Sequence, residues 1–309
     1  MYKRQCIDRQ DNGEKEKWFS HTLNDFINLP GSMPEKLKGD EVTAKTQWTG
    51  SLYDSSYYYN PYMEKYRKEG NIKFPFFLTP DKHYVGAAWY QKEVNIPADW
   101  KGERILLFLE RPHIETTVWV NGQKTGMQNS LCVPHQYDIT HYVRPGKCTI
   151  TIRVDNRIKE INVGPDSHSI TDQTQGNWNG IVGRICLQTT PKTYFDDIQI
   201  YPEPEQKLAR VKVVIKGTGT AKVKLSAESF NTDKKHIVPA IQQEIKLNKG
   251  VTETEMVLPM GNDMLLWDAF HPALYKLKAE VTNGKKTEIK EIQFGMRRFE
   301  IKGKWFYVC

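Results

Sequence analysis

The stretch that decides the fold is Ala88-Trp-Tyr-Gln-Lys-Glu-Val-Asn-Ile-Pro97, in which apolar and polar side chains alternate before a proline. Side chains on a β-strand point to opposite faces in turn, so this pattern predicts a strand with one buried face. Asn121-Gly122 and Arg144-Pro-Gly146 are typical turn sequences between further strands. Those strands are Arg104 to Leu109, Thr116 to Val120 and Cys148 to Val154. The first part of the chain is therefore predicted to be an antiparallel, all-β domain.

A second run of predicted strands begins after Pro191, and in it lysines alternate with apolar residues. Such strands bury one sheet face and expose the other, which is typical of an immunoglobulin-like sandwich. The clearest are Asp197 to Tyr201, Ala209 to Ile215, Ala221 to Ala227, Gln243 to Leu247 and Leu274 to Val281. The domain break is predicted near Thr189 to Lys192. Only the segment from Pro61 to Gly70 has the proline start and glycine stop of a short helix.

Composition narrows the class of protein. A length of 309 residues favours two domains, and 39% hydrophobic residues are enough for two cores. The 44 Lys and Arg are dispersed among 37 Asp and Glu, which argues against nucleic-acid binding. No apolar run is long enough to cross a membrane, and no signal peptide is recognisable, so we expect a soluble protein of undecided compartment. The five cysteines have no zinc-binding spacing, so no metal site is expected.

Six short signatures occur in a fixed order along the chain. They are Trp18 with Ile27-Asn-Leu-Pro-Gly31, Ala88 to Pro97, Thr117-Val-Trp-Val-Asn-Gly-Gln-Lys-Thr-Gly126, Gly176-Asn-Trp-Asn-Gly-Ile-Val-Gly-Arg184, Leu266 to Leu277 and Phe294-Gly-Met-Arg-Arg298. Together they resemble glycoside hydrolase family 2, the family of β-galactosidase, β-glucuronidase and β-mannosidase. An ordered set that covers nearly the whole chain is more specific than a likeness of fold.

The resemblance implies a jelly-roll, galactose-binding-like sugar-binding domain over residues 1–190 and an immunoglobulin-like β-sandwich over 191–295. Residues 296–309 resemble the start of a (β/α)₈ catalytic barrel that this sequence does not include. The family's first strand precedes the Trp18 segment, and only Met1 to Cys6 are left to supply it. We therefore expect that strand to be mostly missing and the jelly roll to have an unpaired edge.

Catalysis is not expected from this chain alone. Retaining glycoside hydrolysis uses two carboxyl groups about 5 Å apart, and the resemblance implies that both glutamates lie in the barrel. The Asn-Glu dipeptide that marks the family's acid/base does not occur here. Asp196 and Asp197 are neighbours on a predicted strand and would point to opposite faces. Ser167-His168 and His135 lack a nucleophile motif, so no catalytic residue or cofactor is predicted.

Sugar contacts are the better prediction. In relatives, loops of the jelly roll reach the edge of the barrel's pocket, and the segment Asn71 to Phe76 is similar to one whose Asn contacts sugar. A second loop has Thr174 where relatives have Asp, which changes the expected hydroxyl pattern. The substrate-binding candidates are Asn71, Asp172, Gln175, Asn177 and Trp178. The alternative for Asn177, Trp178 and Arg184 is a purely structural role.

Two questions stay open at this point. The tyrosines from Tyr53 to Tyr66 are equally consistent with carbohydrate stacking and with loop packing. The favoured function is a non-catalytic front part of a family 2 glycoside hydrolase, which binds carbohydrate weakly and works with the absent barrel. The alternative is a free-standing carbohydrate-binding module or a structural β-sandwich. Neither nucleic acid nor a membrane is an expected partner.

Overall fold

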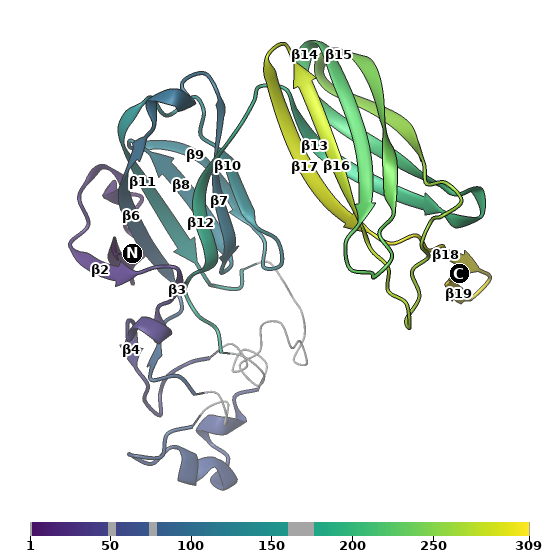
Figure 1. The fold of residues 1–309 in the computed structure, drawn as a ribbon. Coiled ribbons are helices and arrows are strands. Elements are labelled where there is room, and N and C mark those ends of the chain that lie inside the picture. Colours follow the sequence, from purple (N-terminus) through teal and green to yellow (C-terminus); the bar gives the residue numbers. More distant parts are fainter. Residues whose placement is uncertain (1, 49–53, 74–78, 160–175, 309) are drawn as a thin grey trace. The chain divides into compact units, whose positions relative to one another are not determined.

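The computed structural model describes residues 2–48, 54–73, 79–159 and 176–308 (Figure 1). The chain folds as two compact units, Met1–Thr189 and Thr190–Cys309, and the described secondary structure of both consists of β-strands with a few short 3₁₀ helices. The predicted all-β fold class is confirmed. Within the described residues, no helix has the length and apolar character needed to span a bilayer.

The first unit is a sandwich of two antiparallel sheets. Its larger sheet has the strand order β2-β1-β6-β11-β8-β9. The bounds are β2 (Asp25–Asn28), β1 (Tyr2–Asp8), β6 (Ala87–Ile96), β11 (Gly146–Asp155), β8 (Glu115–Val120) and β9 (Gln123–Asn129). The smaller sheet has the order β10-β7-β12-β3, with β10 (His135–Asp138), β7 (Arg104–Pro112), β12 (Gly180–Thr190) and β3 (Gly31–Ser32). The predicted strand from Trp89 to Ile96 is thus the third strand of the large sheet.

The inner faces of the two sheets form one apolar core. Tyr90 of β6, Leu107 and Leu109 of β7, Ile152 of β11 and Ile181 of β12 are all buried there. Because alternate residues of a strand face opposite sides, Trp89 and Gln91 lie on the other face of the large sheet. Two β-strands of two residues each, β4 (Asp40–Glu41) and β5 (Lys82–His83), form a separate ladder. The predicted helical segment is a 3₁₀ helix, η5 (Pro61–Tyr66), capped by the Asn60 side chain.

Strand β1 differs from the expectation of a mostly missing first strand. It has seven residues and pairs with β2 through Tyr2 to Gln5 and with β6 through Arg4 to Asp8. The prediction was wrong because it counted only Met1 to Cys6, whereas Ile7 and Asp8 continue the ladder opposite Ala88 and Ala87. Strand β2, rather than β1, forms the edge of the large sheet.

An aromatic cluster covers the outer face of the large sheet. The rings of Trp89 and Trp119 lie 4.9 Å apart, and the ring of Phe19 stacks on Trp119 at 5.2 Å. Phe19 belongs to the 3₁₀ helix η1 (Trp18–Ser20), so residues from the segment after β1 shield the sheet from water. Trp119 is therefore buried, but outside the main core.

The second unit is a sandwich made largely by two long strands. Strand β14 (Leu208–Ser229) pairs with β15 (Ile237–Pro259) along almost its whole length. The first half of β14 also pairs with β13 (Tyr194–Glu203), and its second half pairs with β16 (Tyr275–Asn283). Strand β17 (Lys286–Phe294) completes the second half beyond β16. The two strands predicted within Leu208–Ser229 are thus one strand. The register of this strand breaks between Gly217 and Gly219. The φ of Gly219 is +86°, a left-handed conformation that glycine adopts without strain.

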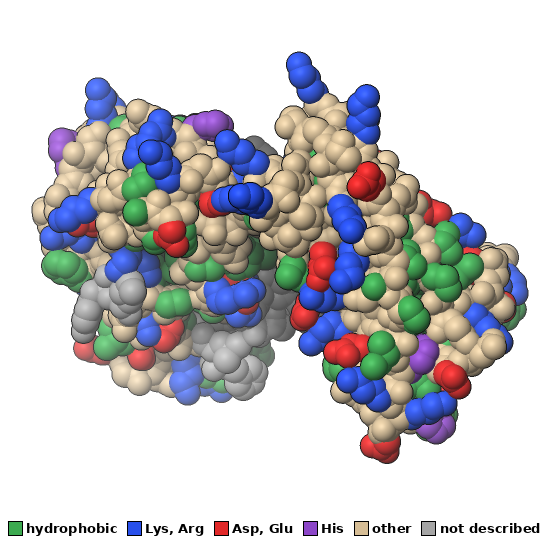
Figure 2. Space-filling view, turned by 45° about the horizontal axis from the view of Figure 1, so that its top comes forward, with side chains coloured by type: hydrophobic (Ala, Val, Ile, Leu, Met, Phe, Trp, Pro, Cys, Tyr) green, Lys and Arg blue, Asp and Glu red, His purple; other side chains and the backbone are tan. Residues whose placement is uncertain are grey.

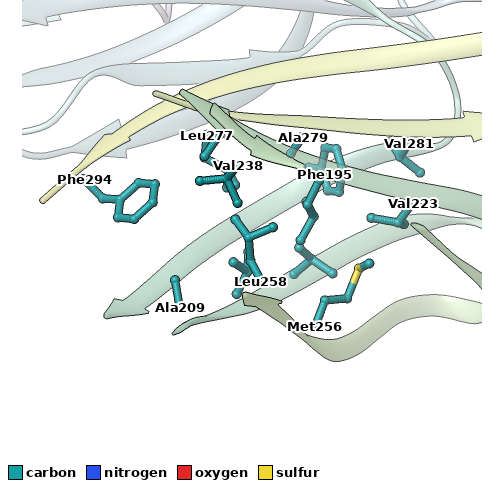
Figure 3. Packing of buried hydrophobic residues seen from close by; sticks show 14 of the residues in the cluster. Phe195, Ala209, Val223, Val238, Met256, Leu258, Leu277, Ala279, Val281 and Phe294 are labelled. Carbon is teal, nitrogen blue, oxygen red and sulfur yellow. The ribbon is translucent and has the colours of Figure 1, made fainter. Parts of the chain in front are cut away.

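The core of the second unit lies between these two halves. Figure 3 shows Ala209 and Leu258 on one side with Val223, Leu277 and Ala279 on the other. A short hairpin, β18 (Phe299–Lys302) and β19 (Trp305–Val308), follows the sandwich. Charged side chains of both signs are interspersed on the face seen in Figure 2, without one dominant basic patch.

Candidate functional site

The first candidate residue, Asn71, ends a compact loop. Its side-chain amide donates a hydrogen bond of 2.7 Å to the carbonyl of Lys65, and its backbone N–H donates one of 3.0 Å to Lys68. These bonds hold the half-buried side chain against the C-terminal end of η5. In Figure 1, this loop region and the start of β12 lie at the same end of the first sandwich.

The tyrosines of the same loop divide into two groups. The rings of Tyr57 and Tyr58 pack on Trp48 with centroids 4.9 and 5.1 Å away, which closes a small apolar cluster. Tyr59 and Tyr62 are instead 70% and 85% exposed. Loop packing therefore accounts for the first pair, whereas the second pair presents rings to solvent.

The second candidate, Asn177, lies in a buried network of three asparagines. Asn156 donates to the side-chain oxygen of Asn177 at 2.9 Å, and Asn177 donates to the backbone carbonyl of Asn156 at 3.1 Å. Asn179 donates to the carbonyls of Gly86 and Val154 and accepts a bond of 2.6 Å from the Tyr90 hydroxyl. Buried amides need such partners, so the network fixes the chain just before β12.

Gly180 shows how closely this chain approaches its neighbour. Its φ is +146°, and a Cβ atom there would lie 2.5 Å from the carbonyl oxygen of Gly31. Only glycine permits the pairing of β12 with β3 at this point. The predicted signature from Gly176 to Arg184 therefore contains a steric requirement as well as polar residues.

Trp178 packs against a buried histidine. Its ring stacks on the ring of His113 with centroids 4.4 Å apart, and His113 Nδ1 donates to the Trp178 carbonyl at 2.9 Å. Burial lowers the pKa of His113 from 6.5 to about 4, although the bond to the carbonyl acts in the opposite direction. The imidazole is therefore neutral at pH 7.

Acidification below pH 6.5 is expected to destabilise the first unit through His113. In that range the unfolded chain binds a proton at this residue while the folded chain does not, until the pH reaches about 4. The difference in the pKa of His113 between the unfolded and folded chain corresponds to a loss of about 3 kcal/mol in the free energy of unfolding between pH 6.5 and pH 4. Urea unfolding at pH 7.0, 5.5 and 4.5 measures it. His113→Gln should flatten the profile, while substitution of the exposed His141 by Gln should not; equal slopes would contradict the assignment.

Charged side chains form a second network beside the asparagines. Asp155 is fully buried and contacts Arg153 at 3.0 Å, Arg157 at 2.5 Å and Lys159 at 2.8 Å. Asp11 and Glu115 complete it through Arg153 and Lys159. Burial opposes ionisation of Asp155, but hydrogen bonds from Arg157 and Lys159 hold its pKa far below the usual range. The sequence analysis predicted neither the asparagine network nor the charged network around Asp155. The only features of the sequence that indicate them are the alternating charges from Arg153 to Arg157 and the asparagines at 177 and 179.

Two of the five sugar-binding candidates, Asp172 and Gln175, lie outside the described residues, as does the pair Ser167-His168. His135, Asp196 and Arg184 all have partners within the fold. His135 is buried and hydrogen-bonded to Thr116 and Ser130, and Asp196 pairs with Lys216 at 3.0 Å. Arg184 pairs with Glu110 at 3.0 Å. In the described part of the chain, no three His, Cys, Asp or Glu side chains are grouped as a metal site would require.

Comparison with known proteins gives two family matches. Residues 11–191 match the sugar-binding domain of glycosyl hydrolases family 2, and residues 193–297 match a second model, described as glycosyl hydrolases family 2. Human β-glucuronidase is 26% identical over 265 residues, which cover 73% of this chain and 39% of that protein. Clostridium acetobutylicum β-galactosidase is 26% identical over 285 residues, with 91% of this chain and 28% of the relative covered.

Solved structures show the same fold. A family 2 member from Bacteroides cellulosilyticus superposes with a TM-score of 0.66 at 19% identity, over 99% of this chain and 37% of that one. A Ruminococcus gnavus β-glucuronidase in complex with D-glucaro-d-lactam gives 0.65 at 17% identity, over 100% and 46%. This chain thus spans less than half the length of these relatives, and it belongs to glycoside hydrolase family 2.

Proposed function

We propose that this chain is the non-catalytic, sugar-binding front part of an enzyme that hydrolyses O-glycosidic bonds. The observation that carries the proposal is the match of two successive family 2 domains over residues 11–191 and 193–297. Relatives named as β-glucuronidases and β-galactosidases are much longer than the matched region. The chemistry is assigned to the part of those relatives that this chain does not match.

The carboxylates of the described chain support the proposal that catalysis belongs to another part of the enzyme. A retaining mechanism needs two carboxyl groups about 5 Å apart that face one glycosidic bond. The buried carboxylate of Asp155 is surrounded by three cations. The buried Asp8 accepts hydrogen bonds from the backbone of Asn12 and Gly13 and from the Trp89 indole. Both groups serve the fold rather than a substrate.

The proposed partner is a catalytic barrel. On one face of the hairpin β18–β19, Phe299, Ile301 and Phe306 are 60 to 69% exposed, and the rings of Phe299 and Phe306 stack with centroids 5.4 Å apart. Contiguous apolar surface of this kind is typical of a face that another domain covers. In the proposal, the second sandwich links the jelly roll to that barrel.

The proposed sugar contacts at the edge of the barrel's pocket are Asn71, Asp172, Gln175 and Trp178, and the buried Asn177 is proposed to position Trp178 for them. The buried asparagine network and the His113 stack would hold the Asn177–Trp178 loop in one position. Preorganisation of this kind raises affinity by reducing the entropy lost on binding. Half a pocket still provides few contacts, so we expect monosaccharide dissociation constants no better than roughly millimolar.

Two measurements on the 309-residue chain test the proposal. Nitrophenyl β-galactoside, β-glucuronide and β-mannoside should not be turned over; hydrolysis that disappears when one of the chain's own carboxylates is substituted would refute the division of labour. In NMR titrations with galactose, glucuronate and mannose, shifts should cluster at Asn71 and Asn177. Asn71→Ala should abolish the shifts around position 71, whereas replacing the exposed Asn95 with Ala should leave them unchanged.

A free-standing binding module is the second candidate, and the exposed rings of Tyr59 and Tyr62 are the observation that favours it. Exposed aromatic rings stack on sugar faces without help from a second domain. Shifts confined to these tyrosines, with sub-millimolar affinity, would select this alternative.

A further inference from the structure

An inter-sheet pocket opens between the two sheets of the first unit. It has a volume of about 200 Å³ and lies entirely within that unit. Its aliphatic walls include Val94 of β6, Leu107 of β7, Ile150 of β11, and Ile181, Ile185 and Leu187 of β12. The short strand β3 pairs with β12 only at Gly180 and Ile181, so it covers only the start of β12. The pocket shares no residue with the proposed sugar contacts.

Two lysines belong to the wall that the large sheet contributes. Lys3 of β1 lies opposite Ile27. Lys92 of β6 lies opposite Ile150, and both isoleucines are buried in the core. Because residues paired across two strands project from the same face, both lysines project into the sandwich. Lys3 is only 9% exposed, and its Nζ donates one bond of 3.2 Å to the Leu29 carbonyl, which leaves two of its three donors for a ligand.

The lining of the inter-sheet pocket contains no carboxylate that could balance these lysines. In the described portions of the chain, neither lysine has an ion pair. Glu93 projects from the opposite face and pairs with another lysine, and Asp25 of β2 pairs with Lys38 at 2.6 Å. Burial, and then repulsion by Lys92, lower the pKa of Lys3 to about 8. An anion near both ammonium groups would relieve this repulsion.

A buried amide beside the lysines also lacks a partner. Gln5 lies two residues from Lys3 on the same face of β1, opposite the lining residue Tyr90. It is completely buried, yet neither its Nε2 nor its Oε1 has a hydrogen-bond partner among the described residues. Buried polar atoms without a partner are rare in folded proteins. A carboxylate held by Lys3 would give this amide an acceptor.

The volume and the neutral polar groups indicate the rest of the ligand. An apolar cavity of about 150 Å³ binds benzene, so about 200 Å³ holds a ring or chain of about six to eight carbons. The Tyr90 hydroxyl already donates to Asn179 at 2.6 Å, and the Gln91 amide donates to the His21 carbonyl at 2.8 Å. A sugar ring would find few partners for its hydroxyl groups, whereas an apolar body would lose none.

We propose that the inter-sheet pocket binds a small apolar carboxylate, either a short fatty acid or an arylalkanoate, with its carboxylate held by Lys3 and Lys92. Its apolar body would lie between β6 and β12 and bridge the two sheets. This site is independent of the proposed role in glycoside hydrolysis.

NMR titrations of the intact protein with hexanoate and 3-phenylpropionate test the site. We expect shifts at Lys92, Ile150 and Leu187, with a dissociation constant of about 0.1–1 mM for at least one of the acids. The acid that binds more tightly identifies the apolar body as a chain or a ring. Hexan-1-ol, the neutral control, should bind roughly tenfold more weakly, and hexylammonium should not bind. Equal binding of hexan-1-ol would overturn the charge assignment, and the absence of these shifts with both acids would refute the site.

Variants locate the ligand. Lys92→Gln should weaken binding of the acid roughly tenfold, because it removes one charge-assisted contact. Leu187→Phe places a larger side chain in the half-buried wall and should abolish binding. Lys147→Gln is the matched control, since Lys147 pairs with Glu93 on the outer face of the same sheet, and it should leave the affinity unchanged. Unchanged affinity in folded Lys92→Gln and Leu187→Phe would refute the proposal, whatever the sugar titrations show.

Discussion

Replacing Asp155 with alanine is expected to lower the free energy of unfolding of the first unit by about 3–5 kcal/mol, because it leaves the buried Arg153 and the half-buried Arg157 and Lys159 without their shared partner. The carboxylate is fully buried and contacts Arg153, Arg157 and Lys159 within 3.0 Å. Arg153 is itself buried, with 8% of its side chain exposed, so water cannot replace the lost carboxylate. Urea unfolding monitored by tryptophan fluorescence measures the loss.

The matched control is Asp40→Ala. Asp40 pairs with Arg9 at the surface, where both side chains are 54% exposed, so its loss should cost no more than about 1 kcal/mol. Asp155 also sets an acid limit. Its pKa in the folded state lies below the usual 3.8, so the stability it contributes is present above that value and is lost as the pH falls further. Similar losses for the two variants would show that the buried network is not a stabilising centre.

Replacing Trp89 with alanine is expected to cost about 3–5 kcal/mol, the range for a large aromatic side chain removed from a packed site. Trp89 is completely buried, its ring lies 4.9 Å from Trp119, and its indole N–H donates to Asp8 at 2.9 Å. The substitution would therefore open a cavity and leave an acceptor of Asp8 without its donor. Thermal and urea unfolding of the intact chain measure the effect.

Trp305→Ala is the control for tryptophan content, because Trp305 is 61% exposed on the β18–β19 hairpin. Its removal should change stability by less than about 0.5 kcal/mol. If Trp89→Ala unfolded at the same urea concentration as Trp305→Ala, the outer aromatic layer would have no structural role.

Most of the fold could be predicted from local pattern. The alternation from Trp89 to Ile96 predicted β6, and the Asn121-Gly122 turn predicted the hairpin of β8 and β9, because period-two burial and turn geometry act between neighbours in sequence. The bend that joins two predicted strands into β14 was not foreseen. Glycines at 217 and 219 signal a turn equally well, and only the pairing of both halves with β15 makes the strand continuous.

The sequence by itself determined the family, the two all-β domains and the apolar residues of each core, because these depend on order and periodicity along the chain. Tertiary structure alone decided which polar residues meet. Asn177 pairs with Asn156, and Arg153 with Asp11, across 21 and 142 residues. Such networks depend on sheet order and on desolvation, which strand periodicity does not encode, so they emerged only in the folded chain.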